Sequence, residues 1–264
     1  MGFFSKDILK GRVALVTGGG SGICQGIAEE FAAHGAQVAI LGRKAEKLAE
    51  AAAAIRKNTG VDVLCTPADV RNTEQVEAAV KAAADKFGKL DILVNGAAGN
   101  FICPASQLSY NGYRTVVEID QIGTFNMCKA AHEHLAKTRN ASIINITATL
   151  QYVGTPFQIH AASAKAGVDA QTRILAVEWG PLGIRVNGIA PGPIRDTEGM
   201  KRLGMGVPET VINKGVPLGR MGTVKEMANT AVFLASDAAS YITGTIIVAD
   251  GGQWLFRPFG PDRM

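Results

Sequence analysis

Residues 12–24 read RVALVTGGGSGIC, a short apolar run that leads directly into a cluster of glycines. The apolar part, RVALVTG at 12–18, is rich in β-branched residues and predicts a strand. The glycine-rich part, TGGGSGIC at 17–24, is followed by CQGIAEEFAAHG at 24–35, which has helical spacing. Glycines in such a turn let backbone N–H groups approach a pyrophosphate, and the helix start favours the negative charge. A glycine-rich loop alone is also compatible with a simple tight turn, so the rest of the chain has to decide.

The remainder of the chain repeats this alternation of strand and helix. The further predicted strands are QVAILGR (37–43), DVLCTPAD (62–69), LDILVNGAA (90–98), ASIINITA (141–148), IRVNGIAPG (184–192) and GTIIVADGG (244–252). The further predicted helices cover 44–60, 73–87, 110–137, 159–179 and 224–236, with an irregular segment at 193–215. Such apolar strands separated by helices predict a parallel sheet that is covered on both faces. We therefore predict the α/β class, with residues 1–264 forming a single-domain doubly wound parallel sheet, a Rossmann fold.

The composition sets limits on partners and compartment. The 264 residues are 47% hydrophobic and 19% charged, enough for one full core. The formal net charge is only +4 and no dense Lys/Arg cluster occurs, so we expect no nucleic-acid partner. The four cysteines have no metal-ligand spacing, which predicts reduced thiols and no metal site. We find no signal peptide, no run of eighteen apolar residues and no Ser-Lys-Leu ending, and we expect a cytoplasmic protein without membrane association.

The end of the second strand predicts which dinucleotide is used. It reads LGRK (41–44), so Arg43 and Lys44 stand where a site for NAD places a carboxylate on the ribose 2′-hydroxyl. A guanidinium can bind a 2′-phosphate through two hydrogen bonds, whereas a carboxylate would repel it. A solvated helix start is the alternative interpretation of these two charges. We predict that the cofactor is NADP(H).

In combination, these motifs resemble the short-chain dehydrogenase/reductase family over almost the whole chain. The loop at 17–24 resembles TGxxxGxG, although Cys24 replaces the last glycine and its thiol is expected to crowd the helix start. NGAAG (95–99) resembles the NNAG motif, and PGPI (191–194) resembles the loop that holds the nicotinamide carboxamide. IIVADGG (246–252) resembles the last strand, which often lies at a subunit interface, and we expect a homotetramer. The cofactor contacts implied by this resemblance are Thr17, Gly18, Ser21, Gly22, Ile23, Arg43, Asp69, Val70, Asn95, Gly96, Ala97, Lys165, Pro191, Gly192 and Ile194.

Three of the four usual catalytic positions of that family are changed. The family uses Asn, Ser, Tyr and Lys, and the Tyr protonates a carbonyl oxygen. Here Lys165 is present, but Ala161 stands at the Tyr position, Ala148 at the Ser position and Asp120 at the Asn position. At about 6 Å or less, Asp120 and Lys165 would hold each other in the charged form. A water molecule between them could then donate a proton.

The same constellation resembles one branch of the family, the peroxisomal-type 2,4-dienoyl-CoA reductases. The shared stretches include GAAGNFICPA (96–105), EIDQIGTFN (118–126), QIHAASAKAGVDAQTR (158–173) and IAPGPIRDTEG (189–199). The resemblance implies that the substrate is an acyl-CoA thioester, reduced by NADPH from 2,4-dienoyl-CoA to 3-enoyl-CoA in the β-oxidation of unsaturated fatty acids. It also implies that Asp120 and Lys165 are the catalytic pair and act through water.

The chemistry of a dienoyl thioester accounts for the missing Tyr. Hydride arrives at the δ-carbon, negative charge spreads to the thioester oxygen, and the proton goes to the α-carbon, so no phenol is needed beside the hydride-accepting carbon. Two alternatives stay open: a reductase of another conjugated or carbonyl substrate, and a protein that binds NADPH without activity. The carboxylate at position 120 argues against the second, because decay would not specifically favour it.

Four residues are predicted to contact the substrate: Asn100, Phe101, Thr147 and Thr197. Phe101 could stack on the polyene or belong to the core. Thr147 and Thr149 flank Ala148, and the alternation of a strand would point both of them away from its face. Tyr152 could reach the thioester oxygen.

Two further segments could shape the substrate site. Residues 193–215 fall where the family keeps a substrate lid, and their charged residues Arg195, Lys201 and Arg202 could meet CoA phosphates or be solvated. The aromatic tail at 254–264, with Trp254, Phe256 and Phe259, is expected to pack on a neighbouring subunit or to cap a pocket. His160 is expected to be a structural or interface residue, because one helical step from Ala161 turns its side chain away by about 100°.

Overall fold

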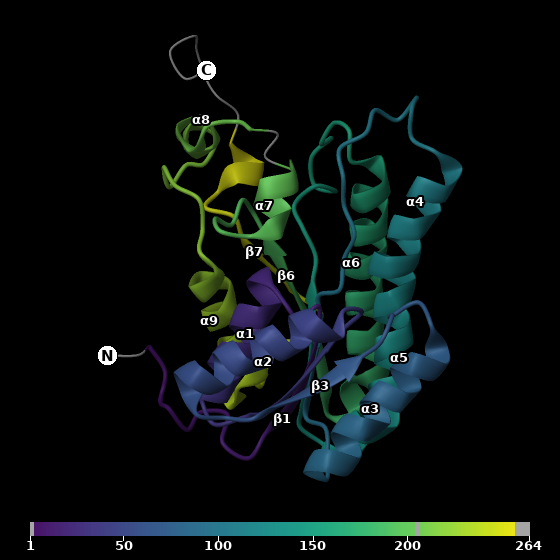
Figure 1. Ribbon diagram of the computed structural model, residues 1–264, viewed down its shortest axis with the longest axis vertical. Helices are drawn as coiled ribbons and strands as arrows, with labels where there is room; N and C mark the ends of the chain where they lie inside the picture. Colours follow the sequence, from purple (N-terminus) through teal and green to yellow (C-terminus); the bar gives the residue numbers. More distant parts are fainter. Residues whose placement is uncertain (1–2, 204–205, 257–264) are drawn as a thin grey trace.

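The computed structural model describes residues 3–203 and 206–256, and a parallel sheet of seven strands lies at its centre (Figure 1). The strands follow the order β3-β2-β1-β4-β5-β6-β7. Their bounds are β1 Val13–Thr17, β2 Gln37–Gly42, β3 Val63–Pro67, β4 Ile92–Asn95, β5 Ala141–Ile146, β6 Ile184–Pro191 and β7 Ile246–Ala249. The chain order reverses between β1 and β4, which is the point where open α/β sheets bind ligands at the carboxyl ends of their strands. The predicted doubly wound parallel sheet is confirmed.

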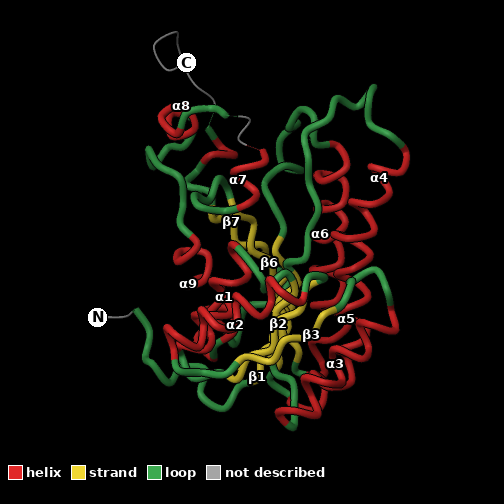
Figure 2. The backbone as a smooth tube through the Cα atoms, in the orientation of Figure 1, coloured by secondary structure: helices red, strands yellow, loops and turns green. Residues whose placement is uncertain are grey.

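Helices cover both faces of this sheet, as Figure 2 shows. The helices are α1 Gly22–Ala33, α2 Ala45–Thr59, α3 Thr73–Phe87, α4 Tyr110–Val117, α5 Gly123–Thr138, α6 Ile159–Trp179, α7 Glu198–Leu203, α8 Glu209–Lys214 and α9 Val224–Ala235. α1, α2 and α9 pack on one face of the sheet, and α3, α5 and α6 pack on the other. Two of these helices, α7 and α8, are short and lie in the segment 193–215, which was expected to be irregular.

Each buried strand supplies one row of side chains to each face. Leu15, Leu93 and Ile143 are neighbours in register and belong to the cluster under α3, α5 and α6. The next residues along each strand belong to the cluster under α1, α2 and α9. Because both faces of the central strands are covered, the strands read as nearly continuous apolar runs.

The helix predicted over 110–137 is interrupted by a π-helical turn at Glu118–Ile122. Two backbone carbonyl groups of this turn accept hydrogen bonds from side chains. Thr124 Oγ1 donates to the carbonyl oxygen of Asp120 at 2.6 Å, and Gln171 Nε2 donates to the carbonyl oxygen of Gln121 at 3.2 Å. A Cβ on Gly123, just after the turn, would lie 2.5 Å from Cγ2 of Val70, so only glycine fits there without a shift. Single π turns occur frequently at functional sites, and this one carries Asp120 into the interior.

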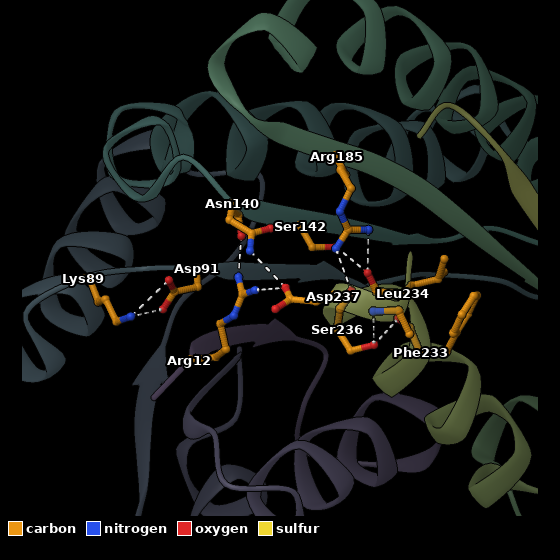
Figure 3. A network of polar contacts seen from close by, with 11 residues as sticks. Arg12, Lys89, Asp91, Asn140, Ser142, Arg185, Phe233, Leu234, Ser236 and Asp237 are labelled. Atoms are coloured by element: carbon orange, nitrogen blue, oxygen red, sulfur yellow. Dashed lines mark hydrogen bonds and ion pairs between the residues drawn. The ribbon is translucent and has the colours of Figure 1, made fainter. Parts of the chain in front are cut away.

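A polar network closes the amino-terminal edge of the sheet (Figure 3). Arg12 Nη2 donates to Asp237 Oδ1 at 2.6 Å, and Asn140 Nδ2 donates to the same oxygen at 3.0 Å. Arg185 Nη1 donates to the Leu234 carbonyl oxygen at 2.8 Å, where α9 ends. These bonds stabilise the end of the sheet that lies away from the carboxyl ends of the strands.

Within residues 3–203 and 206–256, no helix combines the length and the apolar character that a membrane crossing would need.

Candidate active site

At the carboxyl ends of β1 and β4, a side-chain hydroxyl group of one strand binds the backbone that follows the other. The hydroxyl oxygen of Thr17 accepts hydrogen bonds from the N–H groups of Gly96, at 2.9 Å, and Ala97, at 3.1 Å. Gly18 adopts a positive φ of 70°, and a Cβ on it would lie 2.8 Å from the carbonyl oxygen of Gly96. The two loops thus approach so closely that a side chain at position 18 would not fit, as a phosphate-binding loop requires.

The start of α1 is open to an anion. The helix begins at Gly22, with Ile23 as its second residue, and the Ser21 side chain makes no capping hydrogen bond to it. The first N–H groups of a helix lack intrahelical partners and carry partial positive charge. A Cβ placed on Gly22 would meet Thr197 at 3.9 Å, so the loop after β6 faces this helix start. These residues fit the pyrophosphate of a dinucleotide.

A small hollow of about 130 Å³ lies beside the carboxyl end of β2. Its lining consists of Gly18, Leu41, Gly42, Arg43, Ala68, Asp69, Val70, Ala97, Ala98 and Ile119. Arg71 binds both carboxylate oxygens of Asp69, with its Nη2 2.5 Å from Oδ2. This hydrogen bonding lowers the pKa of Asp69, and the charge of Arg43 acts in the same direction. The hollow suits the adenosine end of a dinucleotide, with Arg43 at its rim.

Cys24 is accommodated by a glycine on a neighbouring strand end. Cys24 is buried, and a Cβ on Gly96 would lie only 2.0 Å from its sulfur. The thiol therefore occupies the space that Gly96 leaves free, and the expected crowding of the helix start is relieved there. The larger side chain at position 24 and the absence of a side chain at position 96 therefore compensate each other.

This match predicts a stability cycle. Gly96→Ala should lower the free energy of unfolding by about 1–3 kcal/mol, because the new methyl group overpacks the thiol. In a Cys24→Ala background the same substitution should cost less, since the sulfur is gone and the two sites are coupled. Urea denaturation of the four proteins measures the coupling. Gly180→Ala is the matched control, because no atom lies within 4 Å of its added Cβ. Equal costs of Gly96→Ala in both backgrounds would show that the thiol is not the constraint.

Asp120 and Lys165 form a buried ion pair. Lys165 Nζ lies 3.2 Å from Asp120 Oδ2, and the two side chains are 9% and 1% exposed. Oδ1 of Asp120 accepts the N–H of Gly99 at 2.6 Å, and Nζ also donates to the Ile146 carbonyl oxygen at 2.9 Å. The separation expected from the sequence, about 6 Å or less, is confirmed. Ala161, one helical turn before Lys165 on α6, is buried. Because it is an alanine, its position offers no hydroxyl group.

A cavity of about 850 Å³ opens between the ends of β5 and β6 and the segment that contains α7 and α8. Its lining consists of Asn100, Ala148, Thr149, Leu150, Tyr152, Val153, Thr155, Gln158, Pro191, Gly192, Pro193, Met200, Leu203, Val207, Ile212, Gln253, Trp254, Leu255 and Phe256. Apolar residues from 193–215 and from the end of the described chain form one wall. Trp254 and Phe256 thus cap a pocket, as one interpretation of the tail predicts, whereas Phe259 lies outside the described residues.

The four predicted substrate residues lie in different places. Asn100 lines the cavity, and its Nδ2 donates to Gln158 Oε1 at 2.7 Å. Phe101 is 38% exposed and stacks on His160, with ring centroids 4.3 Å apart. The Thr197 hydroxyl donates to the Ile194 carbonyl oxygen at 2.9 Å, next to the start of α1.

Thr147 lies beyond the end of its strand. β5 ends at Ile146, so the alternation expected for Thr147 and Thr149 is wrong. The Thr147 hydroxyl donates to Asp169 Oδ1 at 2.7 Å and is not among the cavity-lining groups, whereas Thr149 does line the cavity. Reasoning from the sequence missed Asp169, which also accepts a hydrogen bond from Gln151 at 2.9 Å.

Tyr152 lines the cavity and meets Trp254 edge-on, with centroids 5.5 Å apart. Burial, followed by the negative charge of the nearby Asp169, raises the pKa of Tyr152 to about 12. Its phenol therefore stays protonated over the physiological range, and hydrogen bonding of its single O–H to Asp169 contributes to that shift.

The buried thiols are not reactive groups. Burial raises the pKa of Cys24 and of Cys128 to about 12, so both stay protonated at neutral pH. In the part of the chain that the structure describes, no three His, Cys, Asp or Glu side chains gather as metal ligands.

Comparisons with known proteins agree with this geometry. Residues 18–253 match the family model described as Enoyl-(Acyl carrier protein) reductase. The chain is 51% identical over 262 residues to the peroxisomal 2,4-dienoyl-CoA reductase, (3E)-enoyl-CoA-producing, of Danio rerio, covering 99% of this chain and 87% of that protein. Identity to the protein of the same name from Arabidopsis thaliana is 48% over 267 residues, covering 97% and 88%. A short chain dehydrogenase from Bacillus anthracis shares the fold, with a TM-score of 0.88, 44% identity and coverage of 96% and 100%.

Proposed function

The chain belongs to the short-chain dehydrogenase/reductase family, and from this premise we propose that it reduces 2,4-dienoyl-CoA thioesters to 3-enoyl-CoA thioesters with NADPH. Relatives named for this reaction match nearly the whole chain. The observation that carries the proposal is the buried Asp120–Lys165 pair, in a chain that has alanines, Ala148 and Ala161, at the two positions of the catalytic hydroxyl groups. A carbonyl reductase of this family needs hydroxyl groups at those two positions.

Members of this family bind a nicotinamide cofactor, which supplies a hydride when bound. In this chain, Thr17, Gly18 and the open start of α1 would hold the pyrophosphate. Arg43 would bind a 2′-phosphate at the rim of the small hollow. The predicted contacts of Pro191 and Gly192 are supported by their place in the cavity wall, beside Ala148.

The protein's own groups would then manage charge and a proton. The amide of Asn100 lines the cavity, and its second N–H can donate to the thioester oxygen as charge develops there. Tyr152 also lines the cavity, with its hydroxyl group directed to Asp169. Asp120 and Lys165 would hold a water molecule that protonates the α-carbon. Because Asp120 is fixed by Gly99 and Lys165, the carboxylate needs no rearrangement during the step.

An assay of NADPH oxidation tests this function directly. The purified chain should oxidise NADPH rapidly with a short 2,4-dienoyl-CoA, and mass and NMR analysis should identify a 3-enoyl thioester. Simple ketones should give no comparable rate, because no hydroxyl acid is present at positions 148 and 161. A 2-enoyl thioester belongs in the same assay, since the matching family model is described as an enoyl reductase. Turnover of the ketone alone, or of nothing, would reject the proposal.

The choice of NADPH over NADH depends on Arg43. Arg43→Ala should lower kcat/KM for NADPH by about 10- to 100-fold, the worth of a hydrogen bond to a charged group, and should barely change kcat/KM for NADH. Lys44→Ala, at the exposed cap of α2, is the neighbouring control and should have a smaller effect. Steady-state kinetics with both nucleotides provides the measurement. A wild-type preference for NADH would contradict the assignment.

The segment 193–215 is proposed to act as a lid over the acyl chain. Met200, Leu203, Val207 and Ile212 turn apolar atoms to the cavity. Arg195, Lys201 and Arg202 remain candidates for CoA phosphates, although Lys201 lies 3.5 Å from Glu198 and is partly neutralised.

A homotetramer is proposed from the outer surface of the molecule. Four large apolar side chains on the π turn and on the helices α5 and α6 are 45–78% exposed: Ile122, Phe125, Ile174 and Val177. A neighbouring subunit would remove them from water. Light scattering of the purified chain at micromolar concentration measures its mass. The cytoplasmic location also stays a prediction, to be checked by imaging a tagged chain, since the two relatives named above are called peroxisomal.

A further inference from the structure

His160, at the beginning of α6, is a buried imidazole with no hydrogen-bond partner. It is 0% exposed, and neither ring nitrogen has a partner within the described residues. A neutral imidazole always presents one N–H donor and one acceptor nitrogen. Leaving a buried polar group unsatisfied costs about 1–3 kcal/mol, and native structures rarely tolerate it without a reason. The stacking of His160 on Phe101, at 4.3 Å and 24° between the ring planes, accounts for its packing but not for its two nitrogens.

The charged side chain that acts on this ring is Asp120. Burial lowers the pKa of His160, and the backbone of Phe101 and the negative charge of Asp120 only partly oppose that effect. The ring is therefore neutral at neutral pH, and can accept a proton on one nitrogen and release one from the other. His160 is not among the residues that line the cavity, so it does not contact a substrate bound there.

The proposed reaction creates a need at this place. Each turnover consumes one proton, and that proton must reach Asp120 and Lys165, which are 1% and 9% exposed and do not line the cavity. Ala161 and Ala148 cannot pass a proton along, because neither has a hydroxyl group. Phe101, which stacks on His160, is 38% exposed, so on this side one aromatic ring separates the imidazole from the surface.

We propose that His160 relays protons from solvent to the Asp120–Lys165 pair. This inference rests on the proposed reduction, in which a water held by the pair protonates the α-carbon and becomes hydroxide. One ring nitrogen of His160 then releases its proton to restore that water, while the other nitrogen takes up a proton from the solvent side. The ring stays neutral overall and returns to its first tautomer by a flip or by exchange with water. Since it acts through Asp120 and water, His160 is a positioning and relay residue.

Two substitutions separate the relay from simple packing. His160→Phe keeps a stacking ring over Phe101 but carries no proton, and should lower kcat at least about 10-fold while leaving NADPH affinity and the melting temperature close to wild type. His160→Ala opens a space, and added imidazole should restore its kcat in a saturable manner. His132→Ala is the control, because His132 also packs against an aromatic ring, that of Trp179, at 4.7 Å between centroids, and lies outside the site. This variant should keep the wild-type kcat, and added imidazole should not change that kcat.

Either of two results would overturn the relay: wild-type kcat for His160→Phe, or a folded His160→Ala whose lost activity imidazole does not restore. Should His160→Phe fail to fold, the imidazole response of His160→Ala decides alone. NMR of ¹⁵N-labelled histidine gives a readout without turnover: Asp120→Asn should shift the ring nitrogen signals of His160 and leave those of His132 unchanged. An unshifted His160 signal counts against the relay, whereas absence of wild-type turnover with a dienoyl-CoA counts against the proposed function.

Discussion

Replacing Asp120 with Asn should lower kcat for a short 2,4-dienoyl-CoA by about 10²–10⁴-fold, the range typical of a lost general acid or base. The amide has nearly the size of the carboxylate, but it cannot accept from both of its present donors. Gly99 N–H donates to Oδ1 and the Lys165 ammonium group pairs with Oδ2, so one of them would face an NH₂ group. The negative charge that holds the water and balances Lys165 is also lost. Asp120→Ala should be at least as impaired.

The chain offers a closely matched control for this substitution. Asp91 is 3% exposed, accepts a backbone N–H from Val13 at 2.8 Å and pairs with Lys89 at 3.2 Å (Figure 3). It lies before β4, at the amino-terminal edge of the sheet, away from the cavity. Asp91→Asn should therefore lower the stability without lowering kcat. Thermal melting and steady-state kinetics on both variants separate folding from chemistry, and near wild-type turnover by Asp120→Asn would show that the carboxylate is not the proton source.

The fold was predictable because strands and helices alternate with strong apolar signatures. Runs such as 13–17 and 184–191 are buried on both faces. The second run includes the polar residues Arg185 and Asn187, but its other residues are apolar or small enough to predict a strand. Two of the predicted helices, 44–60 and 73–87, end at glycines that adopt positive φ, Gly60 and Gly88. The bounds were therefore correct within a few residues for most elements.

The site was predictable where one motif fixes one position. Lys165 and Asp120 could be paired because each falls at a defined place in a motif, on elements that meet at the carboxyl edge of the sheet. The sequence did not reveal the π turn, because residues 118–122 contain no glycine or proline that would mark a break in the helix. Thr147 was misplaced because the strand ends two residues earlier than expected.

Other features depend on contacts between distant segments. The fit of Cys24 against Gly96 joins two motifs about 70 residues apart in the sequence. The burial of His160 depends on Phe101, which comes from a loop before α4. No local pattern carries such information, because the partner is chosen by the fold.

Lys165→Met should lower kcat by about 10²-fold or more and also raise KM for NADPH by about 10-fold. An ammonium group has three donors, and two of them reach Asp120 Oδ2 and the Ile146 carbonyl oxygen. Within the described residues the third has no partner, so it is available to a hydroxyl of the nicotinamide ribose. Asp120→Asn leaves that donor in place and should change KM for NADPH by no more than about 2- to 3-fold, below the worth of one hydrogen bond.

The double variant Asp120→Asn/Lys165→Met shows whether the two residues act as a unit. Its kcat should be little lower than that of the worse single variant, because groups that perform one step together lose their effect together. Lys165→Met alone leaves a buried carboxylate without its partner, at a cost of about 3–5 kcal/mol, and the second substitution should recover part of that stability. Urea denaturation, NADPH titration and turnover of the four proteins provide the three readouts. An unchanged NADPH affinity in Lys165→Met would remove the lysine from the cofactor site, and strictly multiplicative losses of kcat would mean that the two groups serve separate steps.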